Sequence, residues 1–170
     1  MHVHEAMTPE VASCSPESTL DRVAQIMWER DCGCVPVTDA EGRVVGVITD
    51  RDVCIAAWTQ GKRLSEIPTS LVMSREVYTC GPADTLDGAE AVMRQRRVRR
   101  LPVVDASGRL VGVLSLGDLA PSQGEGRAAT GPGASSVFAT LRWVSEPRTQ
   151  REPKGERAAP PKGGARGATP

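Results

Sequence analysis

The chain has 170 residues, enough for one ordinary domain or two very small ones. It balances 21 Lys and Arg against 21 Asp and Glu, and only 3% of its residues are aromatic. This composition argues against nucleic-acid and membrane partners, which select basic surfaces and, for single strands, aromatic residues. No apolar run approaches the roughly 20 residues of a membrane helix, and the polar N-terminus predicts no signal peptide, so we expect a cytoplasmic protein.

Composition and charge divide the chain near residue 120. Residues 121–170 carry 8 Lys and Arg against 4 Asp and Glu, and they hold 8 Gly and 7 Pro. Such a composition is typical of disordered segments. We therefore expect a folded part followed by a largely disordered, basic, low-complexity tail rich in Gly, Pro, Ala and Arg. Within the tail, apolar residues at helical spacing predict one short helix over residues 136–146.

The folded part contains an internal repeat. Met7-Thr-Pro-Glu-Val11 matches Met73-Ser-Arg-Glu-Val77, and Asp39-Ala-Glu-Gly-Arg43 matches Asp105-Ala-Ser-Gly-Arg109, without a gap. We call this correspondence, in which Met7 falls on Met73, the repeat register. A repeat of this length indicates two similar structural units. The predicted organisation is a first domain over residues 7–60, a linker over 61–72 and a second domain over 73–120.

Each unit is predicted to contain its elements in the order β-α-β-β-α. In the first unit, a strand over Glu10–Cys14 precedes a helix that starts near Ser18 with a sequence similar to a capping box. Strands over Cys34–Thr38 and Arg43–Ile48 follow, joined by a tight turn, and a second helix begins at Thr49. The second unit repeats these elements, with strands over Glu76–Cys80, Arg100–Val104 and Arg109–Leu114 and helices near Asp84 and Ser115.

This arrangement resembles a tandem pair of cystathionine-β-synthase (CBS) domains, also called a Bateman module. The resemblance is carried by the segments Cys34–Asp52 and Arg99–Asp118 and by the openings at Met7 and Met73. It implies an α/β (α+β) fold of two CBS repeats with pseudo-two-fold symmetry. It also implies clefts that hold an adenosine compound, such as AMP, ADP, ATP or S-adenosylmethionine, and pairing of two modules into a homodimer.

Thr49 and Asp52 are candidate binding residues because they stand where a strand ends and a helix begins. Backbone N–H groups at a helix start favour an anion, and a carboxylate one turn later can accept hydrogen bonds from a ribose diol. The same spacing also fits a capping box, which needs no ligand. Ser115 and Asp118 repeat the pattern. The resemblance assigns the hydroxyls to phosphate and the carboxylates to ribose, so both interpretations stay open.

Further cleft residues are implied by the resemblance, although most of them are equally suited to a hydrophobic core. Arg99 and Arg100 belong to a basic cluster that either neutralises phosphate or forms a solvated helix end. The implied residues are Val11, Ala12, Cys34, Val35 and Pro36 near the first ligand, and Val77, Tyr78, Arg100, Leu101 and Pro102 near the second.

The remaining reactive residues predict neither a metal site nor catalysis. Cys32 and Cys34 lack the paired spacing of a structural zinc site, so they are either inert thiols or a redox-sensing pair. The only histidines, His2 and His4, lie near the N-terminus, where we expect a flexible segment. No phosphate-binding loop or catalytic set is present, so we predict no enzymatic activity and no cofactor.

The sequence therefore predicts a regulatory module that senses an adenine-containing nucleotide and signals to an unidentified protein partner. The alternative is an interaction module with empty clefts, tuned by oxidation of its cysteines.

Overall fold

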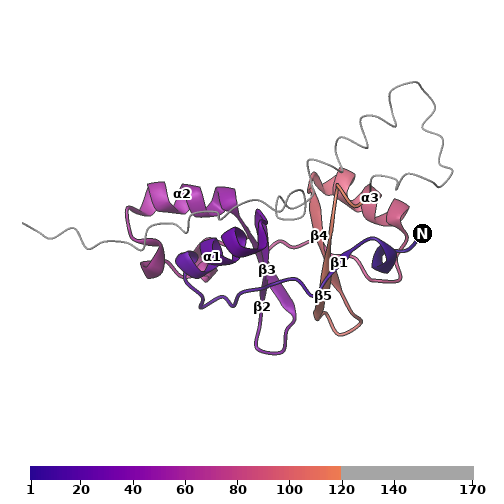
Figure 1. The fold of residues 1–170 in the computed structure, drawn as a ribbon, viewed down its shortest axis with the longest axis horizontal. Helices are drawn as coiled ribbons and strands as arrows, with labels where there is room; N and C mark the ends of the chain where they lie inside the picture. The colour runs from indigo at the N-terminus through magenta and orange to yellow at the C-terminus, as the bar shows by residue number, and fades with distance from the viewer. Residues whose placement is uncertain (120–170) are drawn as a thin grey trace, which may run out of the picture.

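The computed structural model describes residues 1–119 (Figure 1). The tail, including the helix predicted over residues 136–146, lies outside the described residues. The described chain has a mixed α/β fold, as predicted. Its strands and α-helices, in chain order, are β1 (Thr8–Pro9), α1 (Leu20–Arg30), β2 (Cys34–Thr38), β3 (Val44–Thr49), α2 (Asp50–Gln60), α3 (Leu86–Arg96), β4 (Arg100–Val104) and β5 (Leu110–Ser115).

Two antiparallel hairpins, β2–β3 and β4–β5, are the centres of the two halves (Figure 1). The turn of each hairpin begins with an aspartate, and the side chain of this aspartate accepts hydrogen bonds from backbone N–H groups of the same turn. The Asp39 carboxylate accepts from the N–H groups of Glu41 and Arg43, at 3.1 and 2.8 Å. Gly42 supplies the left-handed backbone conformation of this turn, with a φ of 81°. Asp105 and Gly108 play the same parts in β4–β5, with the same φ.

The halves exchange their opening segments, which are residues 1–14 and 67–80. β1, from the start of the chain, pairs with β5 of the second half, with Thr8 opposite Val113. Ser74, which corresponds to Thr8 in the repeat register, pairs with Val47 of the first half. The start of the chain accordingly lies beside α3 in Figure 1. The two repeats are therefore related by a pseudo-two-fold axis and are linked through each other's sheets.

The hairpin tips also meet across this axis. The N–H of Val44 donates to the carbonyl of Gly108 at 3.1 Å, and the N–H of Leu110 donates to the carbonyl of Gly42 at 3.0 Å. These two bonds are equivalent in the repeat register. The tips are thus fixed to each other by backbone groups, so these two bonds do not depend on side-chain identity.

Each half has its own hydrophobic core. In the first, residues of α1, β2, β3 and α2 surround Ile67, which is fully buried. In the second, residues of α3, β4 and β5 surround Val3, which is also fully buried. The segment 61–72, predicted as a linker, contains two short 3₁₀ helices, and Thr69 within it is buried. This segment therefore contributes to the first core.

Several predicted boundaries differ from the structure. Residues 10–14 and 76–80 form no regular strands. Only Cys14 and Cys80 make single parallel bridges, because each segment is crossing between the halves. Helices α1 and α3 follow caps at Thr19 and Thr85, later than the Ser18 and Asp84 caps suggested by the sequence. After Ser115, residues 116–119 form a turn, and the rest of the predicted last helix lies outside the described residues.

Candidate functional site

The predicted pair Thr49 and Asp52 lies where β3 passes directly into α2. The N–H and the hydroxyl of Thr49 both donate to Asp52 Oδ2, at 2.8 and 2.7 Å. The N–H of Asp52 donates back to Thr49 Oγ1 at 3.3 Å. This reciprocal pair is a capping box, so the structural interpretation of the motif is confirmed here. Both residues are half-buried, and the motif remains open to solvent on one side.

Ser115 and Asp118 repeat the bonds to the carboxylate at the end of β5, but the N–H of Asp118 donates to the backbone carbonyl of Ser115, at 3.1 Å. The N–H and the hydroxyl of Ser115 donate to Asp118 Oδ2 at 2.7 and 2.8 Å. Both motifs therefore hold a carboxylate against the end of a strand through one oxygen, Oδ2. The residues between hydroxyl and carboxylate differ, because the first motif contains Arg51 and the second does not contain a basic residue.

The strand pairing regroups the other predicted cleft residues. From the sequence, Val11 is expected beside the first motif and Val77 beside the second. In the structure, the segment that leads to Val77 lies against β3, the strand that ends at Thr49, through the Ser74–Val47 pair. The segment that leads to Val11 lies against β5, the strand that ends at Ser115. Each candidate site is thus built from both halves, because the opening segments cross.

Arg100 links the second half to the first motif. Cys34, opposite Thr49 in the β2–β3 register, is a largely desolvated thiol, and this burial raises its pKa to about 11. The positive charge of Arg100 acts in the opposite direction, and the carboxylate of Asp52 adds to the rise. These three side chains therefore lie within electrostatic reach of one another, although they come from different halves.

Arg99 and Arg100 are exposed and have no carboxylate partner within 4.0 Å among residues 1–119, where the ion pairs all involve Arg43. Their charges are available to an anion.

Tyr78, by contrast, has two partners in the structure. Its hydroxyl donates to the Glu76 carboxylate, and the Arg96 guanidinium lies 4.8 Å from the centre of its ring.

Four predicted residues belong to the cores. Val35 and Leu101 are fully buried in the first and second core, and Pro36 and Pro102 are buried beside them in β2 and β4. Their side chains pack within the hairpins that carry the candidate site. By contrast, Val11 and Ala12 in the crossing segment are only half-buried.

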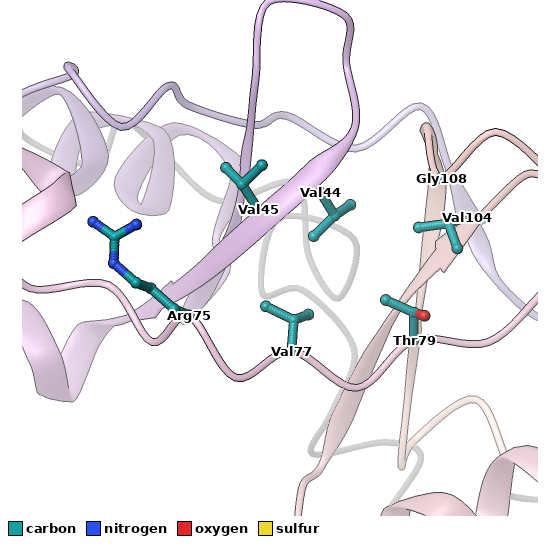
Figure 2. A pocket seen from close by; sticks show the side chains of 7 residues that line it. All are labelled: Val44, Val45, Arg75, Val77, Thr79, Val104 and Gly108. Carbon is teal, nitrogen blue, oxygen red and sulfur yellow. The ribbon is translucent and has the colours of Figure 1, made fainter.

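A cleft of about 330 Å³ opens between the hairpin tips (Figure 2). Figure 2 shows Val77 and Thr79 pointing from the crossing segment toward Val44 and Val104. Of the predicted residues, only Val77 lines this cleft. Arg75 and Thr79 were missed, although alternation in an extended segment puts residues 75, 77 and 79 on one face and 76 and 78 on the other. The cleft is completed by Val45 and Gly108.

Comparison with known proteins identifies the family. The chain belongs to the CBS domain family, whose model matches residues 3–58 and 65–122. The CBS domain-containing protein YhcV of Bacillus subtilis is 40% identical over 121 residues, which are 71% of this chain and 84% of YhcV. The chain therefore contains a pair of CBS domains.

Two solved structures share the fold. Hypoxic Response Protein I, solved with two coordinated zinc ions, has a TM-score of 0.65 and 28% identity, over 71% of this chain and 97% of its own. CBSX2, solved in complex with AMP, has a TM-score of 0.61 and 26% identity, over 69% of this chain and 92% of its own. Within residues 1–119 of the present chain, no helix is long and apolar enough to span a bilayer.

Proposed function

We propose that this CBS pair binds an adenine-containing nucleotide, or S-adenosylmethionine, in the sites formed by its two crossed halves, and that binding regulates a protein partner. The observation that carries the proposal is the doubled hydroxyl–carboxylate motif at Thr49–Asp52 and Ser115–Asp118. The proposal is supported by the AMP complex of the similar protein CBSX2.

In the first site, the ribose diol binds Asp52. Thr49 uses only Oδ2 of this carboxylate, so Oδ1 is the oxygen that we assign to the ribose hydroxyls. The phosphate lies toward the N-terminus of α2, where backbone N–H groups favour an anion. The guanidinium of Arg100 supplies the compensating charge, since arginine binds phosphate with two parallel hydrogen bonds.

The crossing segments contribute the apolar walls for the adenine ring. Val77 and Tyr78 serve the site of Asp52, as the pairing of their segment with β3 favours. Val11 and Ala12 serve the site of Asp118, because their segment pairs with β5.

The two sites differ in the residues beside them. Arg99 and Arg100 stand where the first half has Gly33 and Cys34. The basic pair therefore has no counterpart in the other half, and we propose that the two sites differ in affinity.

The regulatory output passes through protein contacts, because the proposed module has no catalytic role of its own. Ile55 and Trp58, exposed on α2 at helical spacing, form the surface that we assign to homodimer formation. Trp58 is 85% exposed, which is unusual for so large an apolar side chain. We place the protein in the cytoplasm, without nucleic-acid or membrane partners.

The alternative of a redox-tuned module with empty clefts has less support. Burial raises the pKa of the Cys14, Cys32, Cys34 and Cys80 thiols above the ordinary value. The thiolate is the reactive form of cysteine, so a raised pKa lowers reactivity toward oxidants near neutral pH.

A thermal-shift panel with AMP, ADP, ATP and S-adenosylmethionine tests the proposal. A ligand at about 100 times its dissociation constant should add about 2.7 kcal/mol to the free energy of unfolding. Asp52→Ala should remove most of this shift, whereas the control Asp21→Ala, which also removes a carboxylate from the first turn of a helix, should keep it. The proposal fails if none of the four ligands raises the melting temperature.

A further inference from the structure

The two histidines lie in an ordered segment against the loop that precedes α3. Nδ1 of His2 is 2.9 Å from the carbonyl oxygen of Ala83, and Nδ1 of His4 is 2.9 Å from that of Pro82. A carbonyl oxygen can only accept a hydrogen bond, so both Nδ1 atoms carry the hydrogen. In the neutral imidazoles, the free lone pair is therefore on Nε2 in both rings.

The two rings are arranged as a pair. Their centroids are 5.8 Å apart, their planes differ by 15°, and both residues are exposed. Histidines that bind a metal through one ring nitrogen commonly donate the other N–H to a backbone carbonyl or a carboxylate, which fixes the tautomer. His2 and His4 both show this arrangement, and their Nε2 atoms are the groups left for a ligand.

The first half provides an internal control for the role of these residues. In the repeat register, Pro68 and Ser70 stand in place of His2 and His4. The N–H of Ser70 donates to the Pro16 carbonyl at 2.8 Å, as the N–H of His4 donates to the Pro82 carbonyl at 3.0 Å. The same backbone bond is thus made without an imidazole, and the Nδ1 contacts of His2 and His4 are additional to it.

We propose that His2 and His4 together bind a divalent transition-metal ion of the zinc, nickel and copper class, for which imidazole is a suitable ligand. Among residues 1–119, no group of three or more His, Cys, Asp or Glu side chains forms a metal-binding set. The described residues thus supply two imidazole ligands to the ion. The site is separate from the Thr49 and Ser115 motifs. Backbone bonds from Val3 to Asp84 and from His4 to Pro82 hold this segment, which leads into β1, against the second half.

Zinc titration of the full chain, prepared without an affinity tag, tests this directly. The chain has only two histidines, so two-bond ¹H–¹⁵N spectra of the imidazoles contain only the signals of interest. We expect the signals of both rings to move together as Zn²⁺ is added. If neither imidazole responds at millimolar Zn²⁺, the proposal is overturned, whatever any variant does.

The matched variant His2→Pro/His4→Ser copies the first half and should keep the fold. We expect calorimetry to show at least tenfold weaker Zn²⁺ binding by this variant. The second variant Cys32→Ser/Cys34→Ser/Cys54→Ser should bind Zn²⁺ as the unmodified chain does. Undiminished binding by the histidine variant, together with loss in the cysteine variant, would assign the metal to the thiols and refute the proposal.

Discussion

The crossing of the opening segments predicts that Gly112 cannot be replaced without loss of stability. A Cβ atom at this position would lie 2.7 Å from the backbone oxygen of Thr8 and 2.9 Å from Sδ of Met7. The backbone oxygen can move only if β1 shifts away from β5. At the equivalent Gly46, the nearest atom is Sδ of Met73, at 2.7 Å, and the Ser74 backbone oxygen is farther away, at 3.1 Å. A flexible methionine end can move at less cost.

The magnitude follows from these contacts. Forcing an extra methyl group into a packed site costs about 1–3 kcal/mol. We expect Gly112→Ala to cost about 2–3 kcal/mol and Gly46→Ala about 1 kcal/mol. For a domain of this size, one kcal/mol shifts the melting temperature by roughly 4 °C. Gly112→Ala should therefore melt about 8–12 °C below the unmodified chain.

Thermal unfolding followed by circular dichroism is the assay, with Gly81→Ala as the control. A Cβ at Gly81 meets no atom closer than 3.6 Å, which is an ordinary contact. The control should therefore melt close to the unmodified chain. If Gly112→Ala melts as high as Gly81→Ala, the close pairing of β1 with β5 is wrong.

Other predictions concern the first half. Ile67→Ala should cost about 2–5 kcal/mol in urea unfolding because Ile67 is fully buried, whereas Leu71→Ala, at an exposed position, should change the stability by less than about 0.5 kcal/mol. Equal, small effects would make residues 61–72 a true linker. Iodoacetamide at pH 8 should label Cys54 first, because Cys54 is exposed and Cys34, with a pKa of about 11, is still a thiol. Faster labelling of Cys34 would contradict the burial. Burial raises the pKa of Cys34 from 9.0 to about 11, so the neutral thiol stabilises the folded chain below pH 9, and this stability is lost as the pH rises through 11. We expect urea unfolding at a series of pH values to show this loss for the unmodified chain but not for Cys34→Ser. Equal pH dependence of the two free energies of unfolding would contradict the raised pKa.

Local signals in the sequence predicted the local structure well. The start of α2 at Thr49 was predicted because a hydroxyl and a carboxylate three residues apart satisfy the first N–H groups of a helix. The start of α1 was misplaced because Ser18 and Thr19 are adjacent hydroxyl residues. Ser18 instead accepts a hydrogen bond from Ser15, in the turn before the helix. Sequence alone does not decide which of two adjacent polar residues caps a helix.

The exchange of opening segments was not predictable in the same way. Alternation indicates that a segment is extended, but not which strand it joins. Residues 1–6 and 67–72 share no identical residue in the repeat register, yet both make equivalent bonds. The N–H of Leu86 donates to the carbonyl of Met1, and the N–H of Leu20 donates to that of Ile67. These are backbone bonds, so the repeat extends further in structure than in sequence.

The candidate site was predicted in its polar residues but not in its grouping. Thr49, Asp52, Ser115 and Asp118 form the pairs expected from their spacing. The assignment of Val77 to one motif or the other depends on the crossing, which is a tertiary property. For the same reason, alternation places Arg75 on the same face as Val77 but does not indicate that this face lines a cleft between the hairpin tips.

The central claim is that the crossed halves bind an adenine nucleotide through the carboxylate at residue 52. Calorimetric titration of AMP into the full chain, Asp52→Ala and Asp21→Ala tests it most directly. We predict that AMP binds the full chain and Asp21→Ala alike, and that Asp52→Ala binds at least tenfold more weakly. Absence of binding to the full chain at millimolar AMP, or equal binding by Asp52→Ala, would contradict the account.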